Sequence, residues 1–290
     1  RSQIMYHIGI TFEVFRMAGI SSLTRLFVYA SCTAIFGVAL AISSESHAAV
    51  SLVSHKALYA IQIKTVRTGS DVVGVHGKIL SEVKKSCDGW IANNKLDLTY
   101  EYSEDSPVQV ETKMTSFEGF DGKTLNFSSI RTNNGELDRE LRGIAKASAT
   151  GHGKVQFSIP DNLSFDLTEN TFFPEAHTAK LIALAQNGQR IFNAHVFDGS
   201  DDKGPVEINV VIGRKTCGTS KDPLLAGCGW AIREAVFHDT SDGQSVSDYE
   251  MSMDLLENGV VKNMTADYHS FSVTQKLIAI EKVNEECGVE

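Results

Sequence analysis

The sequence lacks the short motifs that identify common catalytic sites. Neither Gly-x-Ser-x-Gly nor His-Glu-x-x-His occurs in its 290 residues. The run from Gly122 to Thr124 resembles the end of a phosphate-binding loop, but the position that requires the upstream glycine holds Phe117. Ser81 and Lys84 have the Ser-x-x-Lys spacing of some acyl enzymes, yet they lie in strand-like sequence without the companion motifs. These absences predict a protein that is not an enzyme and requires no cofactor.

An excess of positive charge is also missing. The chain has 27 Lys and Arg residues against 36 Asp and Glu residues, and its formal net charge is −9. An acidic surface repels the phosphate groups of nucleic acids and of anionic lipids, so nucleic acid is not an expected partner. No Pro- or Ser-rich linker, short repeat or low-complexity tract interrupts the chain, which predicts one continuous domain after the N-terminal segment.

A single long apolar run is present, at residues 26–42. It carries no charge, follows Arg25, and leads to small residues that end at Ala48 and Ala49. This order of a basic residue, an apolar stretch and a small-residue exit is typical of a secretory signal peptide. We therefore expect cleavage after Ala48 or Ala49, and residence in the periplasm of a Gram-negative cell.

The signal peptide has two open details. A membrane-spanning helix is the alternative for the apolar run, since the run is at the lower length limit for crossing a bilayer. Met17 would open a signal of ordinary length, and residues 1–16 would then be an over-extended start. In either case we expect residues 1–48 to be the signal, and residues 49–290 to form a single periplasmic domain.

One segment of the remaining chain has a helical pattern, at residues 171–188. Thr171 is suited to cap a helix, Pro174 to occupy its first turn, and Gly188 to end it in the left-handed conformation. Ala, Leu and Lys residues supply the body of the segment. We predict one central helix here.

The rest of the chain alternates between apolar and polar residues, as strands do. Turn-forming residues separate these segments, with Asn93 and Asn94 among the expected turns. The pattern predicts about thirteen strands in a large antiparallel meander. A sheet of that size must curl, close or split, so we expect an all-β, barrel-like sheet, with a two-sheet sandwich as the alternative. The expected strands are 56–67, 72–84, 95–102, 108–117, 124–130, 137–147, 154–159, 190–197, 206–214, 230–238, 246–255, 260–267 and 270–282.

Four cysteines lie beyond the signal segment. None forms a Cys-x-x-Cys pair, which argues against a zinc site. Disulfides are expected in an exported protein, and four cysteines allow three pairings. Cys217 ends one expected strand and Cys228 begins the next, so a bridge between them would close the base of a hairpin. That pairing leaves Cys87 with Cys287.

Several groups of residues, in this order, resemble one known family. They are Ala49 to Tyr59, Cys87-Asp88-Gly89-Trp90, Phe173-Pro174-Glu175-Ala176-His177-Thr178, the Gly188 stop and Val196-Phe197-Asp198-Gly199-Ser200-Asp201. Together they resemble the periplasmic family that includes the cell-envelope integrity protein EipB, over residues 49–287. The resemblance implies a broken, spiralling barrel with the helix tucked against it. It also implies a disulfide between Cys87 and Cys287.

His177 and the aspartates after the helix are the candidate residues for chemistry. His177 lies beside Glu175 at the start of the expected helix, where backbone donors can face an anion, but packing or capping is the simpler role. Asp198, Asp201 and Asp202 could offer oxygens to calcium, although their spacing is not that of an EF-hand loop, and a solvated turn is preferred. We predict no catalytic or metal site. The candidate binding or structural residues are Phe173, Pro174, His177, Asp198 and Asp201.

The resemblance implies a family whose loss weakens the cell envelope. Because the sequence offers no catalytic set, we predict a non-catalytic protein that maintains the envelope by binding another envelope component. A periplasmic tetratricopeptide-repeat protein is the first candidate partner, and a lipid or cell-wall component is the second. A carrier of a lipid or another apolar ligand is the main alternative. In it, four apolar side chains would line or plug the mouth of the barrel: Phe172, Phe173, Leu181 and Leu184. An envelope hydrolase that uses Glu175, His177 and Asp198 is the less favoured alternative.

Overall fold

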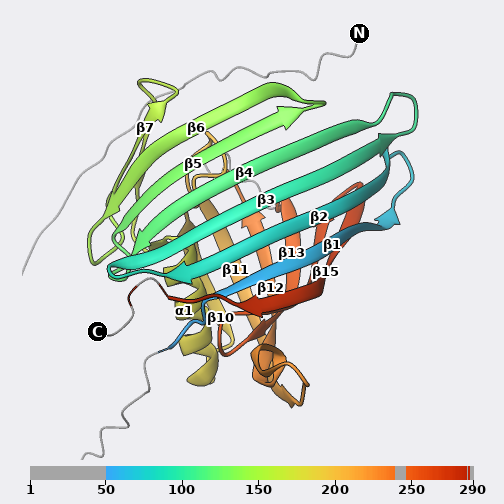
Figure 1. Cartoon of the computed structure of the whole chain (residues 1–290). Helices are drawn as coiled ribbons and strands as arrows, with labels where there is room; N and C mark the ends of the chain where they lie inside the picture. The colour runs from blue at the N-terminus through green and yellow to red at the C-terminus, as the bar shows by residue number, and fades with distance from the viewer. Residues whose placement is uncertain (1–49, 239–245, 286, 288–290) are drawn as a thin grey trace, which may run out of the picture. The chain divides into compact units, whose positions relative to one another are not determined.

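A computed structural model describes residues 50–238, 246–285 and 287, all within one compact unit, His47–Glu290. These residues form a fifteen-stranded sheet, the helix α1 (Pro174–Gln186) and the short 3-10 helix η1 (Pro223–Leu225) (Figure 1). The strands are β1 (His55–Val66), β2 (Val72–Lys85), β3 (Gly89–Tyr102), β4 (Val108–Gly119), β5 (Thr124–Asn133), β6 (Glu136–Ala147), β7 (Gly153–Ile159), β8 (Ser164–Leu167), β9 (Thr171–Phe172), β10 (Ile191–Val196), β11 (Val206–Gly218), β12 (Gly227–Phe237), β13 (Tyr249–Leu256), β14 (Val261–Tyr268) and β15 (Phe271–Lys282). The expected signal peptide lies outside the described residues.

The sheet is an antiparallel meander that curls until its first and last strands meet. Its order is β8-β7-β6-β5-β4-β3-β2-β1-β15-β14-β13-β12-β11-β10-β9, and only β9 and β10 pair in parallel. The edges β8 and β9 follow one another in the chain but are not neighbours in the sheet. Figure 1 shows β1 to β6 as one broad curved wall and β10 to β13 as the wall behind it. The expected all-β, barrel-like sheet with one helix is therefore confirmed, with fifteen strands instead of about thirteen.

Two details of the strand prediction were wrong. The short strands β8 and β9 were missed, since four and two residues carry too little alternation to be recognised. Asn93 and Asn94 lie inside β3, and the turn lies earlier, where the N–H of Ser86 donates to the carbonyl of Gly89 at 2.8 Å. Asn93 is tolerated in the strand because its side chain accepts a hydrogen bond from Thr115 on β4.

The helix is shorter at its start than expected. Phe173, not Thr171, is its N-cap, and Pro174 is in the first turn. Thr171 belongs to β9, and its hydroxyl donates to the carbonyl of Thr168 at 2.8 Å, so it is not available as a cap. Gly188 follows the helix with a φ of 75°, in the left-handed region that favours glycine. Within the described residues, no helix is long and apolar enough to cross a membrane.

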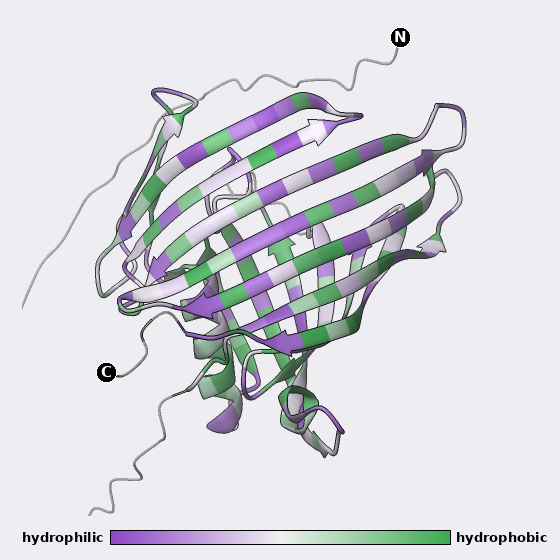
Figure 2. Ribbon diagram, viewed as in Figure 1, coloured by the Kyte–Doolittle hydropathy of each residue, from purple (hydrophilic) through white to green (hydrophobic). Residues whose placement is uncertain are grey.

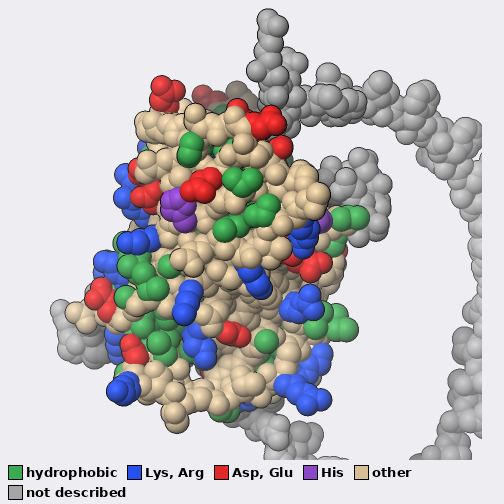
Figure 3. Space-filling model, turned by 90° about the vertical axis from the view of Figure 1, so that its right-hand side faces the viewer, with side chains coloured by type: hydrophobic (Ala, Val, Ile, Leu, Met, Phe, Trp, Pro, Cys, Tyr) green, Lys and Arg blue, Asp and Glu red, His purple; other side chains and the backbone are tan. Residues whose placement is uncertain are grey.

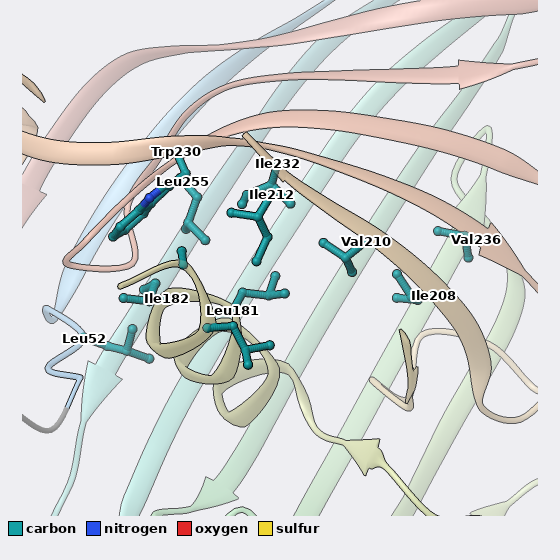
Figure 4. Packing of buried hydrophobic residues seen from close by; sticks show 12 residues of the cluster. Leu52, Leu181, Ile182, Ile208, Val210, Ile212, Trp230, Ile232, Val236 and Leu255 are labelled. Atoms are coloured by element: carbon teal, nitrogen blue, oxygen red, sulfur yellow. The ribbon is translucent and has the colours of Figure 1, made fainter. Parts of the chain in front are cut away.

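The core lies on the concave side of the sheet. Figure 2 shows apolar and polar residues alternating along most strands, as expected when one face is buried. One cluster packs Leu181 and Ile182 of α1 against strand residues such as Ile212 and Trp230 (Figure 4). A second cluster centres on Phe127, with other members from β5 to β8, together with Phe173 and Phe197. The helix therefore packs on the inner face of the sheet.

Candidate functional site: two cavities at the start of α1

The first turn of α1 is held by a carboxylate from the sheet. Phe173 offers no side-chain cap, but Glu118 on β4 takes this role. Its Oε2 accepts from the backbone N–H of Glu175 and its Oε1 from that of Ala176, both at 2.8 Å. Only 3% of Glu118 is exposed. A carboxylate satisfies unpaired N–H groups and favours the positive end of the helix dipole, so Glu118 fixes α1 to the sheet.

Two cavities adjoin this contact. The smaller has a volume of about 240 Å³ and the larger about 520 Å³. Leu52 and Glu175 line both cavities, so these two side chains lie between them. The smaller is lined mainly by the inner faces of β1, β2 and β14, and its apolar residues include Tyr59, Ile79, Val83, Val261 and Met264. The larger lies among the starts of β1 and β3, the end of β4 and the helix, and it is lined by residues that include Lys85, Trp90, Glu118, Phe120, Ala179 and Glu285.

Acidic groups dominate the larger cavity. Three carboxyl groups line it, from Glu118, Glu175 and Glu285, against the single ammonium group of Lys85. Burial raises the pKa of Glu118 to about 8, although the two N–H donors of the helix favour its charged form. Burial also raises the pKa of Glu175 to about 7. The Glu175 side chain makes no hydrogen bond or ion pair with the described part of the chain. The negative charge at this site therefore changes with pH near neutrality.

Aromatic rings form another part of the same wall. Trp90 and Phe120 meet edge to face, with ring centroids 5.8 Å apart. The Nζ of Lys85 lies over the Phe120 ring, 5.9 Å from its centroid. Phe120 is 46% exposed, so its ring is accessible. This wall thus combines carboxyl groups with aromatic surface, both of which attract cations.

His177 is buried among aromatic rings and has a packing role. Its ring lies 6.4 Å from that of Phe172 and is stacked on that of Phe192 at 6.3 Å. Its Nε2 is buried without a hydrogen-bond partner among the described residues. Burial lowers the pKa of His177 to about 4, so the imidazole is neutral at pH 7. Because Glu175 and His177 are two positions apart on a helix, they project in different directions.

The aspartates after β10 have structural contacts of their own. Asp198 Oδ1 accepts from the N–H of Ser200 at 2.8 Å, and Asp201 Oδ1 accepts from the N–H of Lys203 at 2.9 Å. Asp201 Oδ2 also lies 3.1 Å from Nε2 of His238, whose Nδ1 is 3.1 Å from Asp248. Among the described residues, no group of three or more His, Cys, Asp or Glu side chains is arranged to hold a metal ion. These aspartates shape the turn and join it to the end of β12.

The side chains proposed to plug the barrel are mostly part of its core. Phe173, Leu181 and Leu184 are 1%, 2% and 8% exposed, respectively. Phe173 belongs to the Phe127 cluster, while both leucines pack in the cluster around Trp230. Phe172 is half-buried beside His177. None of the four lines either cavity, so the cavity walls come from other residues.

The sheet topology brings Cys87 and Cys287 together. Cys87 is in the turn after β2, and Cys287 follows β15. Both strands flank the start of β1, where Ser54 binds each of them: its Oγ accepts from the N–H of Lys85, and its carbonyl from that of Val283. The two cysteines form a disulfide with a Cα–Cα distance of 5.2 Å across a sequence separation of 200. The disulfide links the turn after β2 to the chain after β15, close in sequence to Lys85 and Glu285, which line the larger cavity.

A second disulfide joins Cys217 and Cys228, which face each other across β11 and β12. Their Cα atoms are 3.9 Å apart, and the sequence separation is 11. This bridge lies at the end of a hairpin, as the spacing of the two cysteines indicated.

The face shown in Figure 3 has no concentrated patch of one kind of side chain. On the face shown in Figure 3, Lys and Arg side chains are interspersed with acidic and apolar ones. Ile191 and Val211 are paired across β10 and β11 and are 78% and 54% exposed. An apolar spot of two side chains is ordinary on a protein surface. The interior cavities are therefore the better candidate site.

The key residues of this site were not all found from the sequence. Glu175 was named, but only as part of a catalytic hypothesis. Glu118 lies at the end of β4, where an acidic residue before a glycine looks like part of a solvated turn. Its inward direction depends on the pairing of β4 with β3 and β5, opposite Trp90 and Leu125. No local sequence pattern marks Glu118, because its direction is set by strand pairing.

Comparisons with known proteins agree with this fold. A family model described as EipB-like matches residues 46–284. The cell envelope integrity protein EipB of Brucella abortus (strain 2308) is 29% identical over 273 residues, which cover 92% of this chain and 94% of that protein. The crystal structure of a beta-barrel-like protein from Brucella abortus matches with a TM-score of 0.74 and 28% identity, and covers 81% of this chain and 100% of that one. Since the family model spans most of its length, this chain belongs to the EipB-like family.

Proposed function

We propose that this protein maintains the integrity of the cell envelope as a non-catalytic periplasmic binding protein, with the two cavities at the start of α1 as its binding site. One observation carries the proposal: Leu52 and Glu175 line both cavities, which adjoin each other at the start of α1. The larger, at about 520 Å³, is within the usual range of about 300–1,000 Å³ for ligand sites. The relative of this protein from Brucella abortus is named for cell envelope integrity.

The contacts of the three residues in the hydrolase hypothesis support a non-catalytic role. Glu175 lines the cavities, His177 packs on Phe192, and Asp198 binds the turn after β10. Each has a separate task in a separate environment. To catalyse hydrolysis, these three side chains would have to reach the same reacting group of a substrate.

Deletion of the gene followed by complementation distinguishes binding from hydrolysis. We expect the deletion to increase sensitivity to detergent and to cell-wall antibiotics. A variant with His177→Phe and Asp198→Asn should restore resistance, because it keeps the packing and leaves the cavities intact. Failure of this variant to complement at wild-type protein levels would favour the hydrolase.

Export is part of the proposal. The sequence of residues 26–48 supports a cleaved signal peptide. N-terminal sequencing of protein released by osmotic shock should begin at Ala49 or Val50. An uncleaved N-terminus in the membrane fraction would contradict a free periplasmic protein. A periplasmic tetratricopeptide-repeat protein is the proposed protein partner, on the basis of the family resemblance.

A carrier of an apolar ligand is the second candidate. It is favoured by the smaller cavity, which has apolar side chains from β1, β2 and β14, including Tyr59, Ile79 and Val261. Native mass spectrometry after mild purification should then show a co-purifying lipid. Repeated recovery of empty protein would count against a carrier.

A further inference from the structure

The larger cavity has more acidic groups than basic ones. Its wall contains the carboxyl groups of Glu118, Glu175 and Glu285 and only the ammonium group of Lys85. The helix N-terminus satisfies Glu118 through two hydrogen bonds. Glu175 has no comparable partner in the described part of the chain, although its side chain is half-buried between two cavities. A half-buried carboxylate without a partner calls for a cation.

The aromatic wall is suited to one kind of cation. A ring face attracts ammonium groups, and it attracts weakly hydrated alkylammonium groups as well as Lys and Arg. The Nζ of Lys85, 5.9 Å from the Phe120 centroid, shows that a cation can lie over this ring. Trp90 adds aromatic surface beside it. Carboxylates alone would suit a metal ion, but carboxylates with aromatic rings suit an organic ammonium group.

The smaller cavity continues the site with a different chemistry. Beyond Leu52 and Glu175 its wall has apolar side chains, with Ile79, Val83 and Met264 among them. Polar side chains such as Ser81, Asn94 and Gln275 also line it. Apolar surface of this kind binds hydrocarbon, because burial removes both surfaces from water. The two cavities thus offer an acidic, aromatic compartment and an apolar compartment on either side of the same two residues.

We propose that the two cavities hold one amphiphile whose head group carries an ammonium ion and whose hydrocarbon chain enters the smaller cavity. The ammonium group lies between the Glu175 carboxylate and the Trp90 and Phe120 rings. This proposal rests on the proposed function, and it names the chemical class of the envelope component that the site binds.

Binding should depend on pH through the group at the centre of the site. Burial raises the pKa of Glu175 to about 7, so this carboxyl is largely protonated at pH 6 and largely ionised at pH 8. The charged and titratable groups around it are Glu118 from β4, Lys85 from β2, Glu285 after β15, and His55 and Tyr59 from β1. Burial also raises the pKa of Glu118, to about 8, so this group gains negative charge as the pH rises. Affinity for a cation should therefore increase from pH 6 to pH 8.

Calorimetric titration with dodecyltrimethylammonium, below its micelle concentration, tests the proposal on the mature protein. We expect one binding event per chain, at least about tenfold tighter than that of dodecyl sulfate or of choline, which lacks the hydrocarbon chain. Glu175→Gln should weaken binding about tenfold and flatten its pH dependence. Glu104→Gln, in the exposed turn after β3, has the same change of charge and should bind as the wild type does.

A second variant separates this site from adsorption on the acidic surface. Ala179→Phe places a ring in the larger cavity without removing any carboxylate, so it should abolish the binding event. Circular dichroism should first show that each variant is folded. Equal binding by wild type and Ala179→Phe, or by wild type and Glu175→Gln, would overturn the proposal. Tighter binding of dodecyl sulfate that Ala179→Phe abolishes would also overturn it, but would leave the interior binding site and the proposed function in place.

Discussion

Glu118 and Glu175 lie 57 residues apart in the chain, yet the backbone N–H of Glu175 donates to the Glu118 carboxylate at 2.8 Å. The contact has two consequences. It caps α1 from the sheet, and it brings two carboxyl groups to the boundary of the cavities. The element that orders the helix is thus also part of the candidate site. We therefore expect a change in the charge of Glu118 to alter the attachment of α1 to the sheet.

Removal of this cap should destabilise the protein. Glu118→Ala leaves the first two N–H groups of α1 buried without an acceptor, and we expect a loss of about 1–2 kcal/mol in the free energy of unfolding. Glu118→Gln keeps one carbonyl oxygen as an acceptor and should lose less. Urea denaturation of the three proteins at pH 7 measures both effects. Equal stability of Glu118→Ala and wild type would mean that the cap contributes nothing.

The buried carboxyl group of Glu234 on β12 should make the stability of the protein depend on pH. It is 4% exposed, and burial raises its pKa from 4.5 to about 7. Between these values the folded state binds more protons than the unfolded state, so stability falls as pH rises, and the cost is complete above pH 7. Glu234→Gln should therefore be more stable than wild type at pH 8, by up to about 3 kcal/mol. The difference should vanish near pH 4.

Chemical denaturation at several pH values tests this prediction. Glu104→Gln is the control, because it makes the same change of residue at an exposed position. If Glu234→Gln differed from wild type by the same amount at pH 4 and pH 8, titration of Glu234 would not be the cause.

The disulfide between Cys87 and Cys287 should contribute more to stability than the one between Cys217 and Cys228. The first spans 200 residues and the second 11. The loop-closure relation gives upper values of about 5 and about 3 kcal/mol, respectively. Double Cys→Ser variants of each pair, compared by urea denaturation, test the order. A larger loss from the Cys217 and Cys228 pair would reverse it, and peptide mapping without reductant checks the pairing itself.

Sequence periodicity predicted most of the sheet because nearly every strand buries one face. β11 shows this directly, with Ile208, Val210 and Ile212 buried and Asn209 and Val211 exposed between them. It could not predict β8 or β9, whose extended form comes from pairing with β7 and β10. It also misplaced the helix start, because Thr171 has the residue type of a cap but its hydroxyl is bonded elsewhere.

The candidate site was less predictable than the fold. The cap of α1 comes from Glu118, far away in the sequence, and only the register of β3, β4 and β5 turns that side chain inward. The cavities likewise result from side chains on β1, β2, β14 and α1 that no local pattern connects. The hairpin disulfide, in contrast, depended on local spacing, and the spacing of Cys217 and Cys228 indicated it.

The most direct test of the central claim is complementation of the deletion strain with a variant whose cavity is filled. Ala179→Phe should accumulate to wild-type levels and fail to restore resistance to detergent, because the ring occupies the larger cavity. Gln186→Phe adds the same ring at an exposed position of α1 and should restore resistance in full. Full resistance with Ala179→Phe would contradict the claim that this protein supports the envelope through its interior site.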